Sequence, residues 1–157
     1  YFAKNYLRQI TKEMLLENIA DVRKATNDRA VLRALHFFDD NERVDREFSA
    51  LKEGRTADFL KEINASGDSS YKFLQNIFAS SNPGEQGLST GLYLAKNILG
   101  DEGASRVHGG GFAGTIQAFV PDSKLSVFES EMNRVFGEGS CHVLSIRPVG
   151  GVEINID

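Results

Sequence analysis

The chain has 157 residues, of which 41% are apolar and 25% charged, and its formal net charge is −4. This composition excludes a disordered tail or a fibrous repeat, and the mildly acidic balance argues against nucleic acid as the main partner. No apolar run approaches the roughly 20 residues that cross a bilayer, so no membrane partner is expected. The single cysteine, Cys141, cannot form an intrachain disulfide, which suits a reducing cytoplasm.

The first hundred residues are predicted to be helical, because their apolar positions recur at spacings of three and four. One helix is expected from Leu7 to about Val22, and a second after Asn27 and Asp28, which can cap it, up to Gly54. The inward stripe of this second helix is expected to comprise Ala30, Ala34, Phe37, Asn41, Val44, Phe48 and Leu51.

A third helix is expected to begin at Thr56 and to break at the polar run 65–70, with a short helix resuming through 71–78. A turn at Ser81-Asn82-Pro83-Gly84 precedes a further helix whose apolar side runs from Leu88 to Leu99.

After residue 100 the pattern changes to that of strands. Extended segments are expected at 104–108, 115–120, 141–147 and 152–156, with one helix from Asp122 or Ser123 to Phe136. The chain is therefore predicted to be one α+β domain over 1–157. A small four-stranded antiparallel sheet would pack against a layer of about five helices.

One segment stands out, the glycine-rich run from Val107 to Thr115. Four glycines in six residues expose backbone N–H groups that can form an anion-binding nest. The alternative is a wide hairpin loop in which glycine only supplies positive φ. The spacing also matches G-x-G-x-x-G, but the dinucleotide version needs a helix after the loop, and a strand is predicted here. No Walker A motif and no protein-kinase partner motif is present.

The run from Ser105 to Thr115 resembles the third conserved motif of GHMP small-molecule kinases in its galactokinase form. Three further stretches resemble that family in the same order along the chain. They are Arg33-Ala34-Leu35-His36 with Asn41-Glu42-Arg43-Val44, the serine-rich run 64–70, and Ile146-Arg147-Pro148 with Gly150.

The resemblance implies a ferredoxin-like C-terminal half of a two-domain enzyme. Such an enzyme transfers the γ-phosphoryl group of ATP, with Mg²⁺, to the 1-hydroxyl of a sugar such as galactose. The ATP-binding N-terminal half, with its phosphate loop and catalytic aspartate, has no counterpart in this sequence, which opens at Tyr1 as if it were a piece of a longer protein. We therefore expect the chain alone to be inactive, to bind no cofactor, and to have its own N-terminal half as partner.

The resemblance places the wall of the active-site cleft at Gly109, Gly110, Gly111, Phe112, Ala113 and Gly114. His108, Ser66, Asp68 and Ser69 are expected to line the cleft beside it. The alternatives are a solvated histidine at the strand end and helix-capping roles for Asp68 and Ser69. No residue of this chain is expected to be catalytic, and its three scattered histidines predict no metal site.

Two other functions stay open at this stage. The chain is alternatively a stand-alone α+β module that binds a small molecule or a protein partner. It is also compatible with a GHMP kinase that acts on a different small alcohol.

Overall fold

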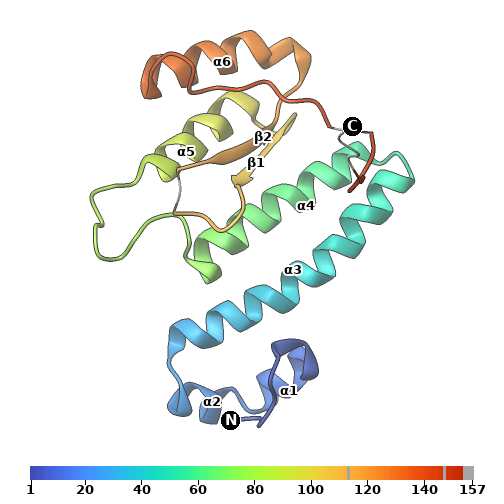
Figure 1. Cartoon of the computed structure of the whole chain (residues 1–157), viewed down its shortest axis with the longest axis vertical. Coiled ribbons are helices and arrows are strands. Elements are labelled where there is room, and N and C mark those ends of the chain that lie inside the picture. Colours follow the sequence, from blue (N-terminus) through green and yellow to red (C-terminus); the bar gives the residue numbers. More distant parts are fainter. Residues whose placement is uncertain (113, 147, 154–157) are drawn as a thin grey trace.

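The computed structural model describes residues 1–112, 114–146 and 148–153. Their fold is α+β, as predicted, with long helices stacked around a short β-hairpin (Figure 1). The elements are η1 (Leu7–Gln9), α1 (Lys12–Glu17), α2 (Ile19–Ala25), α3 (Asp28–Lys52), α4 (Thr56–Ser69), η2 (Ser70–Leu74), α5 (Gly87–Leu99), β1 (Ala104–Val107), β2 (Ile116–Phe119) and α6 (Asp122–Phe136). None of the helices within the described ranges is long and apolar enough to cross a membrane.

The N-terminal helix is shorter than predicted. Thr11 caps α1 by accepting a hydrogen bond from the Met14 N–H, and α1 ends at Glu17, with only Asn18 between it and α2. A buried cluster of Ile10, Leu15, Val22 and Val31 holds these short helices against the start of α3. The predicted cap of α3 is confirmed, because the Asn27 side chain accepts from the Ala30 N–H at 2.9 Å.

Helices α3 and α4 form an antiparallel pair, and α4 continues straight through the polar run that was predicted to break it. Its last residue, Ser69, leads directly into η2, a five-residue π-helix. The short helix predicted through 71–78 is thus formed only as far as Leu74, and 75–78 are not helical. Ser66 and Ser69 lie on the face of α4 that is buried against α3 and β1, and there they make side-chain hydrogen bonds that leave the helical backbone intact.

The sheet has two antiparallel strands in the described residues, not the four predicted. Ala104 pairs with Phe119 and Val107 with Ile116. Asn64 of α4 occupies the other edge of β1, since its side chain bonds Gly103 O at 3.2 Å and the Ser105 N–H at 3.1 Å. An amide from a helix thus takes hydrogen-bonding positions that a further strand would use.

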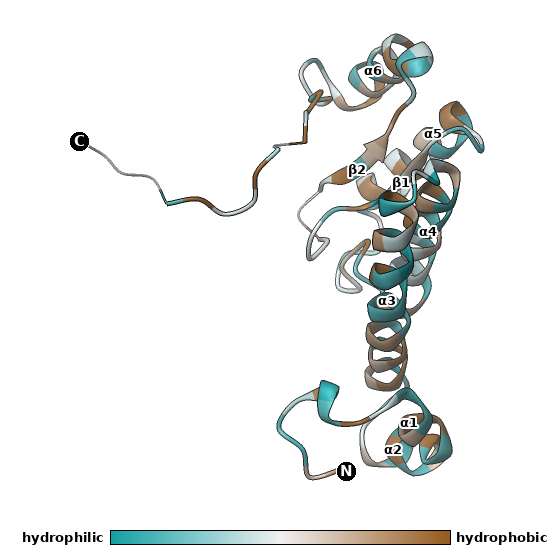
Figure 2. Ribbon diagram, turned by 90° about the vertical axis from the view of Figure 1, so that its right-hand side faces the viewer, coloured by the Kyte–Doolittle hydropathy of each residue, from teal (hydrophilic) through white to brown (hydrophobic). Residues whose placement is uncertain are grey.

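The expected third and fourth strands are not formed in the described part of the C-terminal segment. Cys141 is tied to α6 through its N–H and Asn133 Oδ1, and the chain then leads away from the helices (Figure 2). Leu144 and Ile146 are 87% and 88% exposed. Alternating apolar residues predict which side of a strand would be buried, but not that a partner strand is present. Arg147 and residues 154–156 of these predicted strands lie outside the described residues.

Two further apolar clusters pack against the hairpin, and Ile116 of β2 contacts both of them. Ala95, Leu99, Phe128 and Met132 join α5 to α6 under β2. Ile77, Leu88 and Val107 bury the end of β1 next to the segment that follows η2. The hairpin is thus fixed at its strands, and the loop that joins them projects from a well-packed base.

Candidate functional site

The glycine-rich loop connects β1 to β2 at the end of the hairpin. The His108 N–H donates to Thr115 O at 3.1 Å, which extends the antiparallel pairing by one step and closes the loop. Beyond this bond Gly109, Gly110 and Gly114 are exposed. A Cβ built on any of these three glycines would have no heavy atom within 4 Å. One side of the loop is therefore bare backbone facing open space.

The other side of the loop is packed against Asn76. Asn76 O accepts the Phe112 N–H at 3.0 Å, and the Asn76 side-chain amide donates to Gly110 O at 3.3 Å. Gly111 lies so close that a Cβ there would stand 2.1 Å from Asn76 O, and its φ is +72°. Only glycine meets both conditions, so the requirement at Gly111 is steric as well as conformational.

Phe112 holds the loop in place through its backbone. Its side chain is 51% exposed, and its φ of +58° is uncommon for an aromatic residue. The bond from its N–H to Asn76 O, rather than packing of its ring, fixes the loop at this point. Ala113, which was also assigned to the loop, lies outside the described residues, and the His108 side chain is exposed at the foot of the loop.

Two of the predicted cleft residues lie inside the protein. Ser66 and Ser69 are 1% and 2% exposed, on the face of α4 that meets α3 and β1. Ser66 Oγ donates to Asp40 Oδ1 at 2.7 Å and accepts from Arg106 Nη1 at 2.6 Å. Ser69 Oγ lies 2.9 Å from His36 Nδ1. The structure does not bring these serines to the loop surface, but it links them to Arg106, two residues before His108.

Asp68 is placed on the opposite face of α4. Its carboxylate is exposed and lies 3.5 Å from Lys72 Nζ, an i,i+4 ion pair. Solvent screening makes such a pair weak. Asp68 is thus separated from Ser66 and Ser69, because consecutive polar residues on one helix point in different directions.

Burial shifts the pKa values of two side chains at the contact between α3, α4 and β1. Burial lowers the pKa of His36, outweighing the nearby Asp40 carboxylate, and thus favours the neutral imidazole. Burial also raises the pKa of Glu47, although the Arg106 charge opposes this. Both shifts favour the uncharged forms, as expected where α3 packs on its neighbours.

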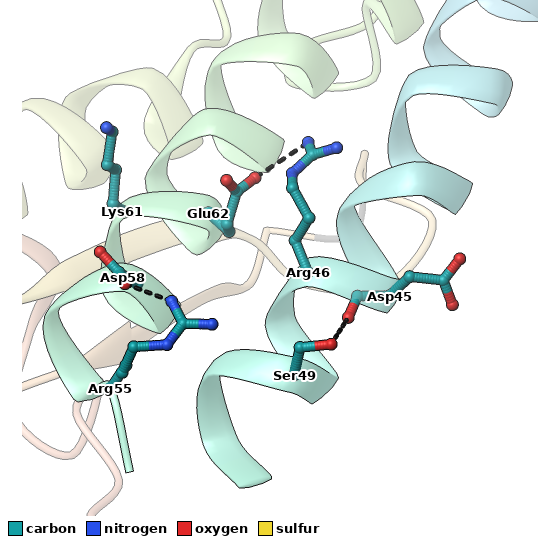
Figure 3. Close-up of a pocket in the computed structure, with 7 residues that line it drawn as sticks. All are labelled: Asp45, Arg46, Ser49, Arg55, Asp58, Lys61 and Glu62. Atoms are coloured by element: carbon teal, nitrogen blue, oxygen red, sulfur yellow. Dashed lines mark hydrogen bonds and ion pairs between the residues drawn. The ribbon is translucent and has the colours of Figure 1, made fainter. Parts of the chain in front are cut away.

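A separate hollow of about 330 Å³ lies between α3 and α4, lined by Asp45, Arg46, Ser49, Arg55, Asp58, Lys61 and Glu62 (Figure 3). Its arginines are paired: Arg46 Nη2 lies 3.0 Å from Glu62 Oε2, and Arg55 bonds Asp58. Both arginines of the hollow are thus neutralised by carboxylates, and we assign no chemistry to it. Among the residues described, no three His, Cys, Asp or Glu side chains come together as a metal site requires.

Asn76 is the site residue that sequence reasoning missed. It follows the exposed Gln75 between the apolar pairs Phe73-Leu74 and Ile77-Phe78, and it is only 2% exposed. A polar residue flanked by apolar pairs can be buried with them, and a buried amide needs a specific hydrogen-bonding partner. What the sequence could not supply was the partner, which lies 34 residues away.

The chain is similar to known galactokinases, as its motifs predicted. It is 32% identical over 125 residues to a galactokinase of Actinobacillus pleuropneumoniae serotype 5b (strain L20), covering 80% of this chain and 30% of that protein. Over the same length it is 30% identical to a galactokinase of Haemophilus influenzae and 29% to one of Glaesserella parasuis serovar 5. The chain thus spans about 30% of the length of these curated relatives. No family model matches it.

Proposed function

Since the chain is related to galactokinases over four-fifths of its length, we propose that it is the C-terminal domain of a galactokinase-like enzyme. The parent enzyme would transfer the γ-phosphoryl group of ATP to the 1-hydroxyl of galactose. The N-terminal half of that enzyme would be the partner of this domain, and the cytoplasm its location, since a lone cysteine suits a reducing compartment.

The observation that carries this proposal is the bare, exposed side of the glycine loop. Phosphoryl transfer depends on positioning and on stabilising the charge of the phosphate oxygens. Backbone N–H groups without side chains beside them can approach such oxygens closely. Gly109, Gly110 and Gly114 offer this kind of surface, with no atom within 4 Å of their missing Cβ positions. In the proposed enzyme this loop forms one wall of the cleft.

In this scheme the chain contributes a surface rather than a reacting group. The sugar oxygen forms a bond to the γ-phosphorus, the bond from that phosphorus to the ADP oxygen breaks, and the hydroxyl proton goes to a base outside this chain. Magnesium would enter with the nucleotide, since in phosphoryl transfer the metal bridges the β- and γ-phosphate oxygens. His108, exposed at the foot of the loop, is the side chain best placed to face the cleft.

The proposal is tested with Gly110→Val in the full-length protein that contains this chain. A Cβ at this position would meet nothing within 4 Å, so the Tm should change little, whereas the valine would obstruct the approach of phosphate to the loop. We expect galactose-dependent ATP turnover to fall at least about tenfold. Gly84→Val, at another exposed glycine with open space around it, is the control. Wild-type turnover by Gly110→Val would assign the loop a structural role only.

The isolated chain provides a second test. Without the opposite wall of the cleft it should show no kinase activity and no micromolar ATP binding by calorimetry. Micromolar binding would instead favour the stand-alone module. Assays of the full-length protein with a panel of small alcohols would distinguish galactose from another acceptor.

A further inference from the structure

The backbone of the segment after α4 departs from regular α-helix in two ways. The Gln75 N–H bonds Ser70 O at 2.8 Å and closes a π turn, and Gln75 itself is left-handed with φ +56°. Arg33 of α3 fixes the turn from outside, since its Nε donates to Leu74 O at 3.1 Å. Such local departures persist only where the surrounding structure imposes them. Their result is that Asn76 lies buried against the glycine loop.

Asn76 holds the loop at two points on either side of Gly111. Its backbone oxygen accepts the Phe112 N–H, and its side-chain amide donates to Gly110 O. Gly111 lies between these bonds, in contact with Asn76. The backbone bond would survive any substitution at position 76, whereas the bond to Gly110 O depends on the side chain.

The side chain of Asn76 is not explained by stability. Its Oδ1 is buried, and no hydrogen-bond partner for it exists in the part of the chain that the structure describes. A buried carbonyl without a partner is unfavourable, and an apolar side chain of similar shape avoids that penalty. What an apolar residue cannot replace is the bond to Gly110 O, next to the bare glycine surface.

We propose that Asn76 is the positioning residue of the glycine loop: its side-chain amide, through Gly110 O, sets the loop in the shape that meets phosphate. The inference deepens the proposed function and rests on it for its catalytic consequence. The conformational part, that the Asn76 side chain fixes the loop, holds for the chain whatever its substrate. The two parts are therefore tested by separate measurements.

The first variant is Asn76→Leu in the full-length protein, with Asn82→Leu as the control, because Asn82 is an exposed turn residue. Leucine has nearly the shape of asparagine and removes both the bond and the unpartnered oxygen. We expect an unchanged or higher Tm, together with amide hydrogen exchange across 108–115 that is about tenfold faster. Turnover should fall at least about tenfold, with little change in the KM for galactose. Asn82→Leu should change none of these.

Two further variants keep the test valid if Asn76→Leu fails to fold. Asn76→Asp replaces the amide donor with a carboxylate oxygen facing Gly110 O, and protonation of that carboxyl restores a donor. The turnover of Asn76→Asp relative to wild type should therefore rise as the pH falls. Gly111→Ala breaks the same contact from the loop side, because its Cβ would overlap Asn76 O, and it should also speed exchange in the loop.

The outcomes separate the two claims. Unchanged exchange and turnover in Asn76→Leu, or loss of Tm with turnover per folded molecule preserved, would overturn the inference. If the wild-type protein does not phosphorylate galactose but Asn76→Leu still loosens the loop, the proposed function fails while the positioning role of Asn76 stands.

Discussion

The contact between α4 and β1 and the C-terminal half of α3 differ in how their side chains are used. At the first, Gly67 lets α4 approach so closely that a Cβ would stand 3.0 Å from Ser105 O, and polar side chains bond across the contact. At the second, Val44, Phe48 and Leu51 follow one another at helical spacing but are 59%, 66% and 57% exposed. Close approach, rather than apolar content, therefore marks where this fold is held together.

The largest effect is expected from Gly67→Val. Alanine would already need the backbone of β1 to move by a few tenths of an ångström, and the branched valine adds two methyl groups to that overlap. We expect the free energy of unfolding to fall by about 2 kcal/mol or more, measured by urea denaturation. Gly87→Val, at an exposed helical glycine with nothing within 4 Å, should change it by less than about 0.5 kcal/mol. Equal effects of the two would mean that α4 and β1 are not in close contact.

Ser66→Ala tests the polar hydrogen bonds at the contact between α4 and β1. It removes the hydroxyl that bridges Arg106 and Asp40, leaving both without that partner in a half-buried setting. We expect a loss of about 1–3 kcal/mol in the free energy of unfolding. Ser80→Ala, at an exposed turn serine, is the matched control and should be close to neutral. A neutral Ser66→Ala would show that the bridge contributes nothing to stability.

Sequence periodicity located these helices better than it assigned their faces. The spacing of apolar residues and the cap at Asn27 predicted α3 correctly, because both are local properties. The predicted inward stripe was wrong at most of its positions, since Ala34 and Phe37 are half-buried but Ala30, Asn41, Val44, Phe48 and Leu51 are exposed. The buried side of α3 is marked instead by Val31, His36 and Ala50. That side is chosen by Ser69 and by the α3–α4 contact, which the sequence of α3 alone does not contain. The missing strands have the same cause, since Asn64 takes the free edge of β1 from a distant helix.

The glycine loop of the candidate site could be predicted from the sequence, but its contact with Asn76 could not. Four glycines between two strands correctly predicted a hairpin loop with an exposed backbone. The difference between Gly110, which faces open space, and Gly111, which contacts Asn76, depends on a π turn that no local pattern signals. That residues of this loop line an active-site cleft stays a prediction.

A pH effect of intermediate size is expected from His36. Burial lowers its pKa in the folded state below the value near 6.5 of an unfolded chain, so the unfolded chain binds more protons below that pH. Stability should therefore be full above about pH 6.5 and decline as the pH falls through the lowered pKa. The Tm of the chain between pH 7.5 and about 5.5 measures this. His36→Gln should flatten the decline, and the raised pKa of Glu47, which acts in the opposite direction, is common to both proteins.

The smallest effect is expected on the exposed half of α3. A buried valine near the start of the same helix serves as the control. Val31 is 6% exposed and Val44 is 59% exposed, so the same substitution to alanine samples two environments. Val31→Ala should lower the free energy of unfolding by more than about 1 kcal/mol, from the apolar area it removes from the core. Val44→Ala should stay within about 0.5 kcal/mol, measured by urea denaturation at several protein concentrations. If Val44→Ala causes an equal loss that grows with protein concentration, this face of α3 is buried between molecules in solution. The C-terminal half of α3 would then be held by a second molecule, and the α4–β1 contact by packing within one chain.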